Sequence, residues 1–351
     1  MPCCRRDDET GTRAPYPGDV SAPAPPALIG ALDVLRCPQC GATLELVQRS
    51  LRCPQRHTYD LARAGYVSLL RGNGAISGDD DEMARARERF LASGAYRPLL
   101  EAITDLAADT VPALNAAAPS PAGSTVSEGV GGSDRAGSRV PTVLDAGCGP
   151  GYYLSGMLDR FPTARGIGFD TSARSLRFAA RSHPRAAVHS GDVFAPLPLA
   201  DGSVDALLDV FAPRNPAEFV RVLHPEGRLI VARPAAEHLA ELRALVPGMV
   251  AVDPQKEERL HAALDPHFDL ETQRTVRCAV PLDAASARDL VAMTPSARHI
   301  DAAALPERLE ALKNSPSATP FTVTLSVLLS SHRPRRTAPP LSRWTAEPQG
   351  R

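Results

Sequence analysis

The amino-acid sequence predicts an α/β protein with a mostly parallel sheet covered by helices on both faces, preceded by a small cysteine-bearing module. From residue 140 onward, short apolar runs alternate with stretches of helical periodicity, the pattern of parallel strands joined by crossover helices. Upstream of that region, three cysteines and one histidine lie in two closely spaced pairs. A chain of 351 residues is long enough to hold both parts.

The two pairs are Cys37 with Cys40 and Cys53 with His57, in the spacing C-x2-C-x12-C-x3-H. Together they supply the four soft ligands of a closed tetrahedral Zn²⁺ site, and such a site is structural because no position stays open for water. Gly41 and the alternating residues 43–47 between the pairs predict a short hairpin. The alternative is a set of unrelated groups on a surface loop, which the absence of a surrounding disulfide framework disfavours.

The remaining cysteines, Cys3, Cys4, Cys148 and Cys278, are scattered, which favours a reducing compartment. Residues 1–30 lack the apolar core of a signal peptide, and no run approaches the roughly eighteen apolar residues of a membrane span. We therefore expect a soluble cytoplasmic protein without a membrane partner. With 39 basic and 40 acidic residues the formal net charge is −1, so any nucleic-acid surface must be local.

The sequence divides into six expected segments. Three of them are rich in polar or small residues and in Pro, and are expected to be disordered because they bury too little apolar area to offset the ordering entropy. The six are an extension at 1–30, a zinc-binding domain at 31–72, a helical connector at 73–114, a disordered insertion at 115–139, the sheet domain at 140–331 and a disordered tail at 332–351.

Within these segments, periodicity predicts the elements. The connector should be helical over 79–112, interrupted near Gly94 and Pro98. One of the last two strands is expected to be antiparallel. Strands are predicted at 140–145, 165–170, 186–190, 204–211, 227–233, 272–280 and 321–330, and helices at 152–160, 172–182, 216–223, 236–246, 254–264 and 283–292.

A glycine-rich loop follows the first predicted strand and opens a helix. Gly147, Gly149 and Gly151 allow the backbone to pass close to a ligand. Asp170, at the end of the second strand, is placed to accept both hydroxyls of a ribose. The pattern therefore indicates a nucleoside-containing cofactor.

The acid that begins this loop distinguishes the candidate cofactors. Asp145 would repel the diphosphate of a dinucleotide, but it suits the sulfonium and amino group of S-adenosylmethionine (SAM). Asp192, followed by Val193, ends the third strand and is expected at the adenine amine. SAM is the better fit, with NAD or a structural turn without a ligand as the alternatives.

Four collinear stretches between residues 33 and 330 resemble the 23S ribosomal RNA (guanine-N1)-methyltransferases of the RlmA type, especially the tylosin-resistance branch. They are CPQC with CPQRHTYDLARAGYVSLL, GDDDEMARARERFLASGAYRPL, VLDAGCGPGYY, and FAPRNPAEFVRVLHPEGRLIVARPAAEHLAEL. The extension, the insertion and the tail lie outside the resemblance, which therefore implies nothing about them.

The resemblance implies a class I SAM-dependent methyltransferase fold, Rossmann-like with seven strands, beside a zinc-ribbon-like domain, often as a homodimer. It implies methylation of N1 of a guanine in a 23S rRNA hairpin, a step of rRNA processing that in this branch contributes to macrolide antibiotic resistance. Its zinc ligands correspond to the two pairs above, and its SAM contacts to Tyr96, Gly149, Pro150 and His238. From the residues alone, Tyr96 is better explained as a half-buried aromatic residue and His238 as a surface helix residue.

The end of the fourth strand is expected over the reacting methyl group, since ligands lie at the carboxyl ends of strands in open α/β sheets. There, Phe211 could stack on a base, and Arg214 or Asn215 could hold its edge or a phosphate. Asp209 is a candidate base for the N1 proton, although no general base is assigned. Alternatively, Phe211 is a core residue and Arg214 caps the next helix.

A local basic patch in the zinc module is the candidate RNA surface, and a solvated face is its alternative. Its arginines are Arg36, Arg49, Arg52, Arg56, Arg63 and Arg71, and a loop at 73–81 is expected to order on substrate. Two other classes remain open. A small-molecule SAM methyltransferase would share the sheet domain, and a non-catalytic ribosome-associated zinc-ribbon protein would lack SAM binding.

Overall fold

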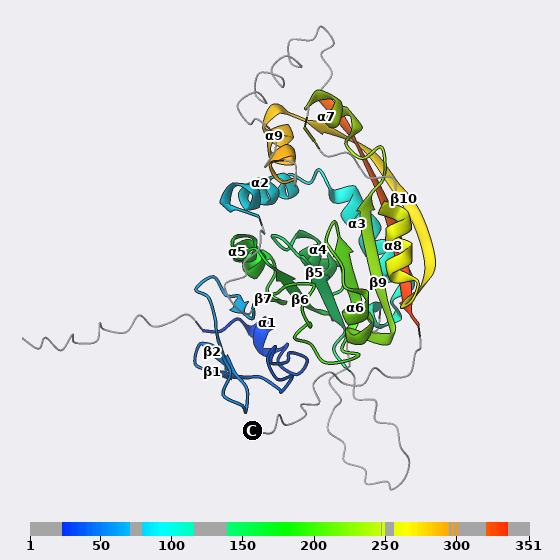
Figure 1. Cartoon of the computed structure of the whole chain (residues 1–351). Helices are drawn as coiled ribbons and strands as arrows, with labels where there is room; N and C mark the ends of the chain where they lie inside the picture. Colours follow the sequence, from blue (N-terminus) through cyan, green and yellow to red (C-terminus); the bar gives the residue numbers. More distant parts are fainter. Residues whose placement is uncertain are drawn as a thin grey trace, which may run out of the picture.

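The computed structural model describes residues 23–70, 79–115, 139–246, 248–249, 256–294, 297, 300 and 321–335. It contains a large sheet with helices on both faces and a small sheet near the N-terminus (Figure 1). The large sheet has the strand order β10-β11-β9-β8-β5-β6-β7-β4. Predictions for residues 1–22, Arg71, 73–78, 116–138 and 336–351 fall outside the described residues.

The predicted strands of the large sheet are all present. β11 is antiparallel to both of its neighbours, which confirms the expected antiparallel strand, and the other pairs are parallel. Their bounds are β5 (Thr142–Ala146), β6 (Arg165–Asp170), β7 (Ala186–Ser190), β8 (Val204–Val210), β9 (Leu223–Pro234), β10 (Phe268–Leu282) and β11 (Phe321–Pro334).

The helices form two layers. On one face lie α4 and α5 together with the connector helices, and on the other lie the zinc module, α6 and α8. Asp80 caps α2 by accepting from the Met83 amide, and Gly94 has a positive φ of 79° between α2 and α3. The bounds are α2 (Asp81–Ala92), α3 (Arg97–Thr110), η1 (Pro112–Asn115), α4 (Tyr152–Arg160), α5 (Ala173–Ser182), α6 (Pro216–Val222), α7 (Ala240–Leu245), α8 (Lys256–Leu264) and α9 (Ala284–Ala292).

Alternation along β5 assigns its side chains to the two layers. Val143 belongs to the apolar cluster under α3 and α4, whereas Leu144 and Ala146 belong to the cluster shared with the zinc module. In the neighbouring strand β6, a Cβ at Gly166 would lie 2.8 Å from Leu158 of α4. The glycine therefore lets α4 approach the sheet closely, and this places the N-terminus of α4 above the end of β5.

The zinc module contains a three-stranded antiparallel sheet of β1 (Glu45–Val47), β2 (Ser50–Arg52) and β3 (Thr58–Asp60). Its first two strands form the predicted hairpin, with Val47 opposite Ser50. The short strand β4 (Val67–Ser68) joins the large sheet in parallel beside β7. There the Ser190 hydroxyl accepts the amides of Leu69 and Leu70, at 3.0 and 3.1 Å. The module is thus bound into the sheet edge.

Two element boundaries differ from the expected segments. Helix α1 (Pro26–Ile29) lies inside the range expected to be disordered, because Leu28 packs in the core shared by the zinc module and the sheet. Strand β11 continues past residue 331 to Pro334, since it pairs along its length with β10. The described helices include none with the length and apolar character that a membrane crossing requires.

Candidate functional site

The four predicted zinc ligands converge on one point. The ligand atoms of Cys37, Cys40, Cys53 and His57 all lie within 4.8 Å of one another. The Sγ atoms of Cys40 and Cys53 are 3.7 Å apart, close to the edge of about 3.8 Å of a tetrahedron with 2.3 Å Zn–S bonds. The donor set and its spacing therefore fit Zn²⁺.

Local turns aim these ligands. In the first knuckle the Cys37 amide donates to the Ala42 carbonyl and the Gly41 amide donates back to the Cys37 carbonyl, both at 2.8 Å. His57 points Nδ1 at the cluster, 3.4 Å from the Cys37 sulfur and 3.3 Å from the Cys53 sulfur. The closed turn of the first knuckle therefore holds Cys37 and Cys40 on the same side, facing the second pair.

Tyr59 lies directly behind the cluster. Its hydroxyl is 3.2 Å from the Cys37 sulfur. Burial acts to raise the pKa of Cys37, but the hydrogen bond with Tyr59 and backbone amides outweigh it and lower that pKa to about 6. A thiolate is the form that ligates a metal. Tyr59 is a supporting residue that the ligand spacing did not reveal.

A second site is a cavity of about 430 Å³ at the carboxyl ends of β5, β6, β7 and β8. It has the size of a small-molecule site. Its walls come from the glycine loop, the ends of these strands, and α2 with the turn after it. Predicted SAM residues that line the cavity are Tyr96, Asp145, Gly147, Gly149, Pro150, Asp170, Asp192 and Val193.

The glycine loop leaves space that a side chain would fill. Gly147 and Gly149 have φ values of 74° and 52°, in the region that glycine favours. A Cβ on Gly147 would meet Ala212 at 2.9 Å, and one on Gly149 would meet the Arg87 side chain at 3.3 Å. The backbone of the loop therefore faces the cavity directly, with no side chain between them.

Asp145 faces the cavity from beneath this loop. It is buried, and its Oδ2 atom has no hydrogen-bond partner among the described residues. Burial, reinforced by the nearby Asp170, raises the pKa of Asp145 to about 7. A buried carboxylate with one oxygen unpaired is unfavourable by itself, so the site is suited to a cationic group that approaches Asp145.

Asp170 is held by the loop it faces. Its two oxygens accept the amides of Gly149 at 2.9 Å and Ser172 at 2.8 Å. Burial raises the pKa of Asp170, and these two amides act in the opposite direction. The remaining lone pairs of both oxygens can still accept from a ligand, as a ribose requires.

Arg87, which the sequence did not single out, forms part of the wall. Its Nε and Nη2 atoms pair with both oxygens of Asp79, at 2.6 and 3.0 Å, and Nη2 also donates to the Met293 carbonyl. The hydrogen bond to Met293 joins α2 to the turn after α9. No local pattern in the sequence identifies it, because the wall is assembled from distant segments.

Three aromatic rings form a cluster in which two members, Tyr96 and Phe211, line the cavity. Tyr96 is buried, and its ring centroid is 6.3 Å from that of Phe211 and 6.4 Å from that of His238. Phe211 and His238 are 5.8 Å apart. Burial lowers the pKa of His238 to about 4, so its ring is neutral at physiological pH. His238 lies behind this ring pair, outside the cavity lining.

Phe211 is not a core residue, so the alternative prediction for it is wrong. It is 40% exposed, lines the cavity and has a left-handed φ of 56°, which is unusual for an aromatic residue. Its amide donates to the Ala232 carbonyl at 3.0 Å, which helps to hold this strained conformation. Phe194, 69% exposed, is a further aromatic lining residue, and the sequence did not indicate it.

The three candidate catalytic residues lie behind the lining. Asp209 is fully buried, and its Oδ2 accepts from Arg214 Nε at 2.6 Å. Arg214 also donates to the Ala212 carbonyl at 3.3 Å. The pair therefore holds the 211–214 turn in place, and the buried Asp209 is not among the residues that line the cavity.

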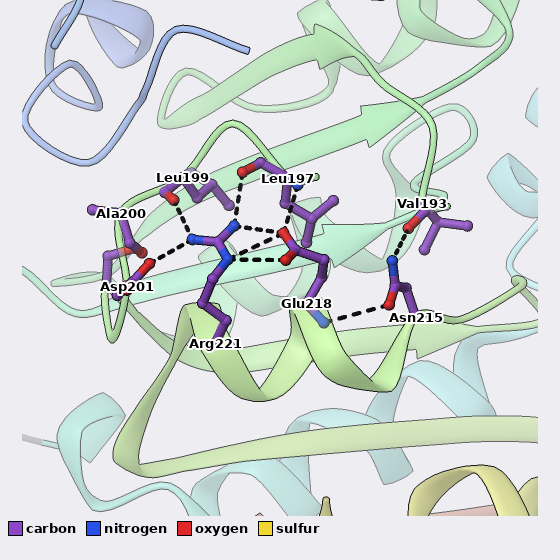
Figure 2. A network of polar contacts seen from close by, with 9 residues as sticks. Val193, Leu197, Leu199, Ala200, Asp201, Asn215, Glu218 and Arg221 are labelled. Atoms are coloured by element: carbon purple, nitrogen blue, oxygen red, sulfur yellow. Dashed lines mark hydrogen bonds and ion pairs between the residues drawn. The ribbon is translucent and has the colours of Figure 1, made fainter. Parts of the chain in front are cut away.

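Asn215 caps α6 and joins two loops. Its Oδ1 accepts the Glu218 amide, and its Nδ2 donates to the Val193 carbonyl at 3.1 Å (Figure 2). Further along α6, the buried Arg221 pairs with Glu218 and donates to the carbonyls of Leu197 and Leu199. Helix α6 thus clamps the segment 193–201 that follows the predicted adenine-binding residues.

Gly151 is also outside the cavity lining, although it belongs to the predicted loop. It caps α4 with a φ of 88°, and a Cβ there would meet the Ser182 hydroxyl at 2.6 Å. Its requirement for glycine therefore comes from the packing of α4 against the end of α5.

Two family models match the chain. The model described as "RlmA, N-terminal", a zinc ribbon, matches residues 35–73, and the model described as "Methyltransferase domain" matches residues 143–227. The first contains the four-ligand cluster, and the second contains the glycine loop, Asp170, Asp192 and the clamp of α6. Together they contain the zinc ligands and most of the cavity lining, whereas Arg87, Tyr96 and Met293 of the lining lie outside both ranges.

Two curated relatives align with this chain over nearly their whole length, and a third aligns over about two thirds of its length. The chain is 44% identical over 304 residues to a Micromonospora griseorubida protein whose name places it among the 23S rRNA (guanine-N(1)-)-methyltransferases, covering 86% of this chain and 97% of that one. It is 39% identical over 301 residues to the 23S rRNA (guanine(748)-N(1))-methyltransferase of Streptomyces fradiae, covering 86% and 96%. A similarly named Bacillus subtilis protein is 31% identical over 216 residues, covering 60% and 67%.

Proposed function

The chain belongs to the 23S rRNA (guanine-N1)-methyltransferase family, and from that premise we propose that it transfers a methyl group from SAM to N1 of a guanine in 23S rRNA. The observation that carries the proposal is the presence in one chain of a four-ligand zinc cluster and a cavity built to take SAM. The zinc is structural, because its four ligands leave no open position.

Different lining residues would contact different parts of SAM. Asp145 would face its positive charge, Gly147, Gly149 and Pro150 would lie along its methionine part, and Asp170 would accept the ribose hydroxyls. Asp192 and Val193 would hold the adenine. Tyr96 would close the side wall, and His238 would act through the rings it contacts.

SAM supplies a methyl group that is already electrophilic, so the protein must mainly align a nucleophile and exclude water. Phe211 is placed to do this. Its exposed ring stands at the carboxyl end of β8, on the cavity wall, where a guanine extracted from a stem can stack. Arg214 and Asp209 hold the turn that presents the ring, and Asn215 links that turn to the adenine side.

The zinc module is the proposed RNA grip. Arg52, Arg56 and Arg63 are exposed, and Arg56 sits at the tip of the second knuckle with a φ of 66°. Arg49 is half-buried and donates to the Ala62 carbonyl, so it also braces the module. Cationic side chains on a rigid platform suit the shape-based recognition of an RNA hairpin.

Primer extension on 23S rRNA from cells with and without this gene tests the proposal. N1-methylguanine blocks base pairing, so reverse transcriptase should stop one nucleotide before the target only when the gene is present. Position 748, named for the Streptomyces fradiae relative, is the first place to look. Identical extension patterns in the two strains would contradict the proposal and favour a small-molecule substrate.

We also propose where the protein acts, how it associates and what it protects against. We expect it to act in the cytoplasm, where ribosomes are assembled. We expect two copies to associate, and light scattering of the purified protein measures this. We also expect macrolide protection, as the sequence resemblance implies. A matched pair of strains differing in this gene should then differ in the minimum inhibitory concentration of tylosin.

A further inference from the structure

The outer face of α5 is an uninterrupted line of arginines. Arg174, Arg177 and Arg181 are all exposed, and their spacing of three and four residues places them on one face of the helix. The opposite face carries the buried Leu176 and Ala179, which pack in the core. No property described above for either site uses these arginines.

Only one of the three arginines on this face has an acidic partner among the described residues. Residues 171–190 contain four arginines and no acidic residue, in a chain whose formal net charge is −1. The fourth, Arg185, is half-buried and donates to the carbonyls of Phe161, Ala164 and Leu158, so it is structural. Among the described residues, no ion pair involves Arg177 or Arg181, and Arg174 pairs with Asp81 at 2.7 Å with both side chains half exposed.

Helix α5 lies between the cofactor cavity and the zinc module. Its N-terminus follows Asp170 and Thr171, which line the cofactor cavity. Near its C-terminus, a Cβ on Gly65 of the zinc module would lie 3.8 Å from the Cβ of Ala180. In Figure 1 the helix lies between α2 and the zinc module. The line therefore runs from the cavity mouth to the module that carries Arg63.

We propose that the outer face of α5 is an RNA-binding surface that continues the zinc-module arginines to the cavity mouth and binds phosphates flanking the target guanine. This inference rests on the proposed function. From Arg174 to Arg181 the helix rises about 10 Å, a length that spans several backbone phosphates. Three guanidinium groups suit phosphate oxygens by charge and by hydrogen-bond geometry.

The test is the salt dependence of RNA binding by the full-length protein. The probe is a transcribed 23S rRNA fragment that the wild-type protein methylates. The variant carries Arg177→Gln and Arg181→Gln, which remove two charges from side chains without ion pairs in the described structure. The slope of log K against log salt should become shallower by roughly 2, about 1 for each lost phosphate contact.

A matched control carries Arg274→Gln and Arg277→Gln. These two exposed residues lie on β10, at the opposite edge of the sheet, and the variant has the same net charge as the first. It should keep the wild-type slope, and both variants should keep wild-type SAM affinity. An unchanged slope in the α5 variant, or an equal change in the β10 control, would overturn the inference. Failure of the wild-type protein to methylate any 23S rRNA fragment would instead count against the proposed function.

Discussion

At the scale of single residues, the cofactor cavity depends on backbone conformations that side chains disfavour. Gly147 and Gly149 adopt positive φ values and leave their surfaces bare to the cavity. The glycine spacing predicted this loop. It did not predict that Gly151 serves helix packing, since that role depends on Ser182 of α5, thirty-one positions away. Arg87 and Phe194 were missed for the same reason.

Replacing Gly149 with valine should abolish SAM binding. A β-branched residue is strained at a φ of 52°, and its Cβ would lie 3.3 Å from the Arg87 side chain and against the cavity. Calorimetric titration measures the loss. The control is Gly202→Val, at a φ of 60° with no atom within 4 Å of the added Cβ. It carries comparable backbone strain, about 1–2 kcal/mol, and should bind SAM normally. Retained binding by Gly149→Val would place the cofactor elsewhere.

Asp145 should make SAM binding depend on pH. With a pKa of about 7 in the free protein, the carboxyl is mostly neutral at pH 6 and mostly ionised at pH 8. A cationic ligand favours the ionised form, so affinity should rise with pH, by about tenfold between these values. Asp145→Asn should bind more weakly and lose this part of the dependence. This variant is also the control, because any titration of SAM itself affects binding to both proteins equally. If the SAM affinities of wild type and variant change with pH in the same way, Asp145 does not have this role.

At the scale of elements, the zinc module and the sheet share one core. Leu51 and Val67 of the module belong to the same apolar cluster as Leu144 and Ile167 of the sheet. The Arg36 amide donates to the Pro198 carbonyl, and the Ala200 amide donates to the Val34 carbonyl. The ligand spacing predicted the knuckles correctly, but β4 is only two residues long and its pairing with β7 is a tertiary effect that periodicity cannot reveal.

Replacing Cys53 with serine should therefore destabilise more than the module. Loss of the zinc should loosen residues 35–68, expose their share of the common core, and lower the melting temperature of the whole protein by roughly 5–10 °C. Metal analysis and differential scanning calorimetry measure the two effects. Cys278→Ser, a half-buried thiol on β10, is the control and should keep its metal. An unchanged main transition in the Cys53 variant would show instead that the sheet domain unfolds independently.

Loss of one partner of the ion pair on α6 should strongly destabilise the protein. Arg221 and Glu218 are 5% and 6% exposed in their side chains and pair at 2.6 Å. Arg221→Met leaves the buried Glu218 carboxylate without its partner and should cost about 3–5 kcal/mol of unfolding free energy in urea. Adding Glu218→Gln removes the stranded charge and should recover part of that loss. If the double variant is no more stable than the single one, the pair is not the source of the effect.

At the scale of the whole molecule, the order and type of the elements were predictable and some of their ends were not. β6, β7 and α4 match the predicted spans because their apolar runs are bounded by clear turns. β10 begins at Phe268, before the predicted start at 272, since an edge strand exposed on both sides shows no alternation there. The resemblance located both sites, but the shared core that joins them came from the packing.

We expect this molecule to transfer a methyl group from SAM to guanine N1 in 23S rRNA. Purified protein incubated with labelled SAM and transcribed 23S rRNA, followed by digestion and mass spectrometry of the nucleosides, measures it directly. The labelled nucleoside should be 1-methylguanosine with wild-type protein, and no labelled nucleoside should form with the Gly149→Val variant. Label on any other nucleoside, or no label from protein shown to bind both zinc and SAM, would contradict it.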